Sequence, residues 1–96
     1  MAFGDVEFRR MFGASGVFYR GLMIALVDDD VLYMKADKNL AREYEQRGLL
    51  PFSYNKQNKL VKLSYYQAPE EALEDPDELA KWAFRSYDVA LRLNQK

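Results

Sequence analysis

One stretch of the chain combines cations with aromatic rings in a spacing that could bind nucleic acid. No acidic residue lies between Gln46 and Pro69. Lysine ammonium groups can neutralise phosphates, and tyrosine rings can stack on bases. The candidate contacts on the hairpin around residues 54–66 are Lys56, Lys59, Lys62, Tyr65 and Tyr66, with Tyr54 beside them. The competing interpretation is a solvated hairpin whose lysines keep a sheet edge from aggregating, and the net charge of -1 favours it.

Three consecutive aspartates, Asp28 to Asp30, could bind a hard cation such as Ca²⁺ or Mg²⁺. Calcium loops, however, space their ligands at alternate positions, whereas adjacent carboxylates point in different directions. The aspartates fit a solvated hairpin turn instead. We therefore predict no metal site and no cofactor.

Catalysis has little support in this sequence, because it contains neither histidine nor cysteine and its serines have no evident activating base. The carboxylate pairs Glu70–Glu71 and Asp75–Asp77 could transfer protons. Their position at a helix N-terminus is already explained by capping and by the helix dipole. We predict that the protein is not an enzyme.

Length and composition predict one globular domain, since 96 residues with 49% hydrophobic and 30% charged residues can bury a core without disulfides. The absence of cysteine fits a reducing compartment. No apolar run approaches the roughly 18 residues of a membrane span. We expect a cytoplasmic protein that does not contact membranes.

The longest apolar stretch predicts a three-stranded antiparallel meander over Val17–Arg20, Leu22–Val27 and Val31–Lys35. Gly21 and the aspartates supply its turns. The middle run has no polar residue, which is typical of a strand covered on both faces. Residues 1–8 are interpreted as an extended or loosely turned lead-in and residues 9–16 as a flexible segment before the first strand.

A short helix and a hairpin should follow the meander. Asp37 can cap a helix over residues 38–47, which Gly48 ends. Residues 51–54 and 59–67 read as two strands joined by a polar turn, and residues 68–74 as a linker.

The clearest predicted helix runs from Pro76 to about Leu93, with Asp75 as N-cap and Glu78 completing a capping box. Trp82 falls in the middle of its apolar stripe and is expected in the core. The stripe comprises Leu79, Trp82, Ala83, Ser86, Ala90 and Leu93, and the expected surface ion pairs are Asp77–Lys81 and Asp88–Arg92. These elements predict an α+β fold, with an antiparallel sheet of about five strands (three-strand meander, helix, two-strand hairpin) covered by the C-terminal helix.

Several spaced segments of this chain resemble the TfoX (Sxy) N-terminal domain family, named for regulators of competence development in bacteria. The segments are RMFG at 10–13, GVFYRGLM at 16–23, LYMKAD at 32–37, PFSY at 51–54, SYY at 64–66, PEE at 69–71 and the helix around Trp82 and Ala83. The resemblance implies a helix, three strands, a helix, two strands and a helix. It also implies a non-enzymatic regulatory or protein-interaction module with a protein partner of unknown identity.

The sequence departs from the family pattern at both ends. Only residues 1–8 precede the Arg-Arg-Met-Phe segment, where the family usually has a helix, and longer members carry a second, C-terminal domain. We expect a single domain over residues 1–96 with a shortened N-terminal helix region. Because that shortening should leave apolar surface uncovered, we predict a two-fold homodimer with Met11, Phe12 and Phe18 near its contact.

Overall fold

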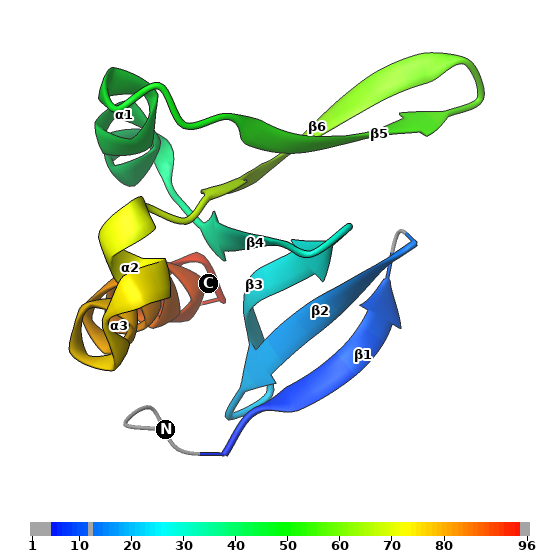
Figure 1. The fold of residues 1–96 in the computed structure, drawn as a ribbon. Coiled ribbons are helices and arrows are strands. Elements are labelled where there is room, and N and C mark those ends of the chain that lie inside the picture. The colour runs from blue at the N-terminus through cyan, green and yellow to red at the C-terminus, as the bar shows by residue number, and fades with distance from the viewer. Residues whose placement is uncertain (1–4, 12, 95–96) are drawn as a thin grey trace.

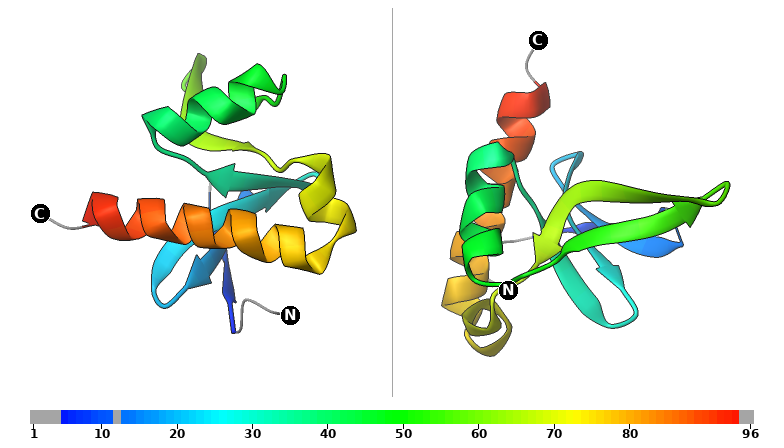
Figure 2. Two further views of the ribbon diagram at one scale, coloured as in Figure 1. Left: turned by 90° about the vertical axis from the view of Figure 1, so that its left-hand side faces the viewer. Right: turned by 90° about the horizontal axis from the view of Figure 1, so that it is seen from above.

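Over the part of the chain that the structure describes, the protein is an α+β domain in which one six-stranded antiparallel sheet carries three helices on one face (Figures 1 and 2). This computed structural model describes residues 5–11 and 13–94. In chain order the elements are β1 (Glu7–Met11), β2 (Ala14–Tyr19), β3 (Leu22–Asp28), β4 (Val31–Lys35), α1 (Lys38–Gln46), β5 (Pro51–Lys56), β6 (Lys59–Gln67), α2 (Glu70–Glu74) and α3 (Pro76–Asn94). The strand order across the sheet is β1-β2-β3-β4-β6-β5. The predicted fold class and the antiparallel sheet are confirmed.

Tight turns set the register of the sheet. Arg20–Gly21, Asp29–Asp30 and Gln57–Asn58 each have positive φ at both residues, which is the type I′ geometry of two-residue hairpins. Polar side chains and glycine tolerate this backbone better than β-branched residues do. The aspartate cluster is thus accounted for as a turn.

The predicted central strand is confirmed, because β3 lies between β2 and β4 and its residues Ile24, Ala25 and Leu26 are buried. The main core lies between the sheet and α1, α2 and α3, and it includes Tyr44 and Trp82. The expected core position of Trp82 is therefore confirmed.

A second cluster of buried apolar side chains lies on the opposite face of the sheet. Ala14, Leu26, Phe52 and Tyr65 are buried there together. They come from β2, β3, β5 and β6, so the two halves of the sheet bend toward each other on either side of β4 (Figure 1). The bend lets one sheet carry two apolar clusters.

Two segments that were interpreted as irregular are regular elements. Residues 7–11 form β1, which pairs with β2 from Glu7↔Phe18 to Met11↔Ala14. The lead-in is extended at residues 7–8, as one of its two predicted forms, whereas the flexible segment was wrong, because β1 continues to Met11 and β2 begins at Ala14. The run Glu-Phe-Arg-Arg does not alternate between apolar and polar residues, so it carries no local strand signal. Pairing with β2 stabilises the strand instead. The linker likewise contains α2, whose Ala72 is buried.

Helix α3 begins as predicted but differs in detail. Asp75 accepts a hydrogen bond from the amide of Asp77 at 2.9 Å, while Glu78 pairs with Lys81 at 2.9 Å instead of closing a capping box. The expected Asp77–Lys81 pair is therefore replaced, and the Asp88–Arg92 pair is confirmed at 3.1 Å. The buried stripe contains Val89, which was missed, whereas Leu93 is exposed because the helix extends past the sheet.

Candidate functional site

The lysines of the β5–β6 hairpin are exposed, but they do not share one face. Lys56 pairs with Lys59 beside the turn, whereas Lys62 pairs with Ser53. Since side chains alternate along a strand, Lys59 lies on the face of Tyr65 and Lys62 on the face of Tyr66. The structure therefore brings Lys56 and Lys59 together and separates Lys62 from them.

The two candidate stacking rings are buried. Tyr65 belongs to the second cluster, with the ammonium of Lys35 4.9 Å from its ring centroid. Burial raises the pKa of Tyr65 to about 12 and lowers that of Lys35. Tyr66 stacks on Tyr44 at 5.7 Å between ring centroids and donates a hydrogen bond to Glu45 at 2.8 Å. Both rings have partners within the domain, so neither offers a free face to a base.

A groove lies on the surface between α1 and α3. Its volume is about 440 Å³, and Phe84 in its lining is 49% exposed. Further lining residues are Asp37, Asn39, Leu40, Glu43, Arg85, Asp88, Val89 and Arg92. The groove thus combines an aromatic ring with charges of both signs.

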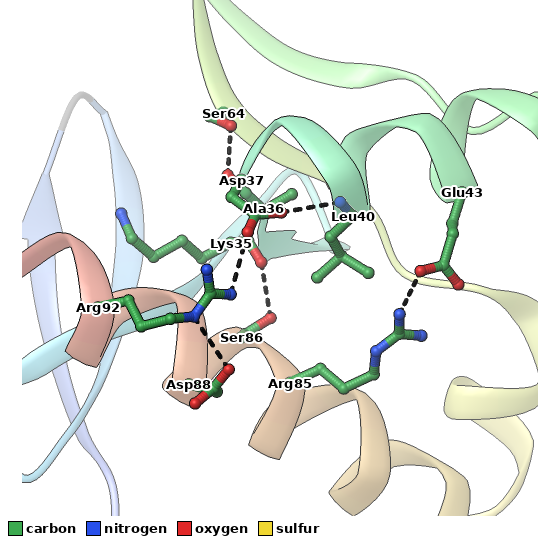
Figure 3. A network of polar contacts seen from close by, with 10 residues as sticks. All are labelled: Lys35, Ala36, Asp37, Leu40, Glu43, Ser64, Arg85, Ser86, Asp88 and Arg92. Carbon is green, nitrogen blue, oxygen red and sulfur yellow. Dashed lines mark hydrogen bonds and ion pairs between the residues drawn. The ribbon is translucent and has the colours of Figure 1, made fainter.

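Ion pairs link the two sides of the groove (Figure 3). Arg92 of α3 contacts Asp37 at 3.0 Å and Asp88 at 3.1 Å, and Arg85 pairs with Glu43 of α1. The pKa of Asp37 is lowered, first by the hydrogen bond from the Leu40 amide and then by Arg92. The lowered pKa keeps the Asp37 carboxylate ionised at neutral pH. The ion pairs hold the guanidinium groups of Arg85 and Arg92 in place.

Buried contacts fix the elements beneath the groove. The Ser86 hydroxyl of α3 donates to the carbonyl oxygen of Lys35 at 2.9 Å, just before α1 (Figure 3). Trp82 lies under the guanidinium groups of Arg85 and Arg47, at 4.8 Å and 5.4 Å from its ring. The sequence predicted that Trp82 lies in the core. Only the structure shows that its ring also contacts the guanidinium groups of Arg47, at the end of α1, and of Arg85, in α3.

Within residues 5–11 and 13–94, no group of three or more His, Cys, Asp or Glu side chains is arranged to hold a metal ion. In that same part of the chain, no helix is both long and apolar enough to cross a membrane.

Comparison with known proteins identifies the family of this chain. The sequence profile of the TfoX N-terminal domain matches residues 1–90. The chain belongs to the TfoX N-terminal domain family. It is also 27% identical over 89 residues to Protein Sxy of Escherichia coli strain K12, an alignment that covers 93% of this chain and 43% of Sxy.

Membership of the TfoX N-terminal family confirms the resemblance seen in the sequence and supports a competence-regulator-like module. The chain spans less than half the length of Sxy, so the activity of the whole relative is not transferred to it. What the module contacts has to be argued from its own surface.

The residues expected at a self-association contact are differently placed. Phe18 is buried, with the guanidinium of Arg9 4.4 Å from its ring centroid. Met11 is half-buried, and it surrounds Gly16 together with Phe18 and Met23, so closely that a Cβ at Gly16 would meet their side chains at 3.1–3.3 Å. Phe12 lies outside the described residues. Self-association stays a prediction, and Phe18 is already covered within one chain.

Proposed function

We propose that this protein is a non-enzymatic cytoplasmic regulatory module that binds a protein partner through the α1–α3 groove. The observation that carries the proposal is the half-exposed ring of Phe84 in a groove whose charges are already paired. Aromatic residues and arginine are enriched at protein interfaces, where an apolar anchor surrounded by polar groups supplies most of the binding energy.

The charge arrangement favours a protein over a nucleic acid at this groove. Binding to a phosphate backbone needs protein cations that are able to neutralise phosphates, which releases the counterions of the nucleic acid. Arg85 and Arg92 each contact a carboxylate, so phosphate binding would first have to break these ion pairs. A protein surface with its own mixed charges can instead add to the network. The absence of histidine and cysteine supports a binding role over a catalytic one.

Site-specific photocrosslinking in the native host tests the groove. With a benzoylphenylalanine at position 84, we expect a discrete crosslinked protein, whereas the same probe at Leu60 on the hairpin should give none. Leu60 is 61% exposed and serves as the matched position far from the groove. Asn39→Trp, which fills the groove, should remove the crosslink, and the same change at exposed Asn55 should not.

The regulatory part of the proposal has a separate readout. If the module acts in competence regulation, Asn39→Trp should also reduce transcription of DNA-uptake genes, while Asn55→Trp leaves it unchanged. Equal crosslinking from positions 84 and 60, or a crosslink that survives Asn39→Trp, would refute the groove as the contact surface.

The second candidate, a nucleic-acid module, is favoured by one observation, the exposed pair Lys56 and Lys59 at the end of the hairpin. We expect no appreciable DNA binding in fluorescence anisotropy at physiological salt, because the tyrosine rings are buried and the lysines are divided between faces. Micromolar binding that weakens with salt and is lost in Lys56→Gln/Lys59→Gln/Lys62→Gln would contradict this ranking. The control is Lys38→Gln/Lys81→Gln, which changes lysines on the helices.

A further inference from the structure

Strand β1 is an open edge of the sheet (Figure 1). Among the described residues its strand partner is β2, and its side chains from Glu7 to Arg10 are exposed. The opposite edge is protected, because β5 begins with Pro51 and its pairing is irregular between Pro51 and Ser53. Of the two edges, β1 is therefore the one able to accept another strand.

The register of the sheet determines which backbone groups of β1 face outward. The Asp28↔Val31 pair closes a two-residue turn and is therefore hydrogen-bonded. The direction of the backbone hydrogen bonds alternates from residue to residue along each strand. When this alternation is followed from β3 through β2 to β1, the N–H and C=O groups of Arg9 point toward Gly16 of β2. The N–H and C=O groups of Phe8 and Arg10 consequently point away from the sheet.

We propose that two copies of this chain pair through β1, antiparallel about a two-fold axis at Phe8. Phe8 then lies opposite Phe8 of the partner subunit and exchanges both backbone hydrogen bonds with it, and Arg10 lies opposite the partner's Val6. The two six-stranded sheets join into one continuous sheet. This inference is independent of the α1–α3 groove and of the partner bound there.

Charge complementarity selects this register. Glu7 and Arg9 lie on one face of β1, where they form an exposed ion pair at 3.1 Å. With Phe8 on the axis, each Glu7 lies opposite the partner's Arg9, so four charges alternate in sign. Moving the axis to Arg9 would instead place two arginines opposite each other, and moving it to Glu7 would place two glutamates opposite each other. Like charges directly opposite destabilise a strand pair.

The other face of β1 supplies an apolar contact. Phe8 is 66% exposed and lies at an apolar cavity of about 190 Å³. Other side chains lining this cavity include Val6, Leu79, Ala80 and Ala83, from the segment before β1 and from α3. Pairing of the two Phe8 rings covers both rings and the side of each cavity beside them. An exposed ring next to an apolar cavity gives the association a hydrophobic contribution.

Cysteine scanning reads the register directly, because the native chain contains no cysteine. In a hydrogen-bonded antiparallel pair the opposed Cα atoms are about 5.5 Å apart, a separation that a disulfide can bridge. Phe8→Cys should therefore form a crosslinked dimer on mild oxidation. Arg10→Cys is the matched control, since the two copies of position 10 would be separated by about 13 Å along the strands. Crosslinking at position 10 and not at position 8 would overturn the proposal.

Charge variants provide a second test that keeps Phe8 intact. Glu7→Lys gives two cations and Arg9→Glu two anions on this face, so each should weaken homodimerisation about tenfold in analytical ultracentrifugation, as opposed pairs turn repulsive. A mixture of the two variants should form heterodimers. The double variant Glu7→Lys/Arg9→Glu, which keeps the native net charge, should dimerise like the native chain. An 11.2 kDa monomer for the native chain at every concentration, or no recovery in the mixture, would refute the proposal.

Discussion

Replacing Trp82 with alanine should lower the free energy of unfolding by about 3 to 5 kcal/mol, the range for truncating a large buried aromatic residue. Trp82 is only 8% exposed and lies 5.3 Å from the ring centroid of Tyr44. Its ring also supports the guanidinium groups of Arg47 and Arg85. The truncation therefore leaves a cavity between α1, α3 and the sheet and removes two cation–π contacts at the same time.

A loss of this size is a large fraction of the stability of the domain, since the free energy of unfolding of natural domains is only about 5 to 15 kcal/mol. Urea unfolding followed by far-UV circular dichroism measures it, because Trp82 is the single tryptophan of the chain and its fluorescence disappears with the substitution. A loss below about 1 kcal/mol, the range of ordinary surface changes, would show that the ring is not a core anchor.

Tyr44→Phe is the matched control for Trp82→Ala in the same cluster. The Tyr44 hydroxyl is buried without a hydrogen bond of ordinary geometry among the described residues, although Ser86 lies close enough to affect its ionisation. Burial is the main cause that raises the pKa of Tyr44. Removing an unsatisfied buried hydroxyl while keeping the ring should be neutral or stabilising by up to about 1 kcal/mol. The contrast separates loss of packing from loss of a polar atom.

The sequence predicted best those elements whose local signals and tertiary role agree. Asp37 caps α1 as expected, accepting from the Leu40 amide at 2.8 Å. Pro76 begins α3 and Trp82 lies in its buried stripe, because the proline position and the helical period both reflect the same helix. The three tight turns were likewise readable from polar residues and glycine between apolar runs.

Features that depend on distant pairing were not predictable from local pattern. The polar β1 is a strand because β2 hydrogen-bonds to it. The residue types from Glu7 to Arg10 do not indicate that pairing. Tyr65 and Tyr66 were candidate nucleic-acid contacts on the hairpin, yet both are buried. The helices cover Tyr66, and the bent sheet covers Tyr65. The α1–α3 groove was missed for the same reason, because it joins residues far apart in the chain, such as Asp37 and Arg92, which are 55 positions apart.

Leu26→Ala tests the second apolar cluster, which the bend of the sheet creates, and should cost about 2 to 5 kcal/mol of unfolding free energy. Leu26 is 0% exposed in β3 and belongs to the cluster that contains Phe52 of β5 and Tyr65 of β6. Its methyl groups therefore help to hold the hairpin against the meander, and their loss leaves a cavity that rigid strands fill poorly. Urea unfolding monitored by Trp82 fluorescence gives the free energy, since that ring lies in the other cluster.

Two comparisons make the Leu26 result specific. Leu60→Ala removes the same atoms from a side chain that is 61% exposed and should change stability by less than about 0.5 kcal/mol. Leu26→Met keeps most of the volume and should cost less than about 1.5 kcal/mol. If Leu26→Ala were as mild as Leu60→Ala, the face of the sheet away from the helices would be an open surface and the bend about β4 would have no packing to maintain it. A large loss for Leu26→Ala, with little change in the two comparison variants, would mean that this cluster holds the β5–β6 hairpin against the rest of the sheet. Amide hydrogen exchange in β5 should then be faster in Leu26→Ala, because the backbone hydrogen bonds of the hairpin open more often when the packing contact is lost.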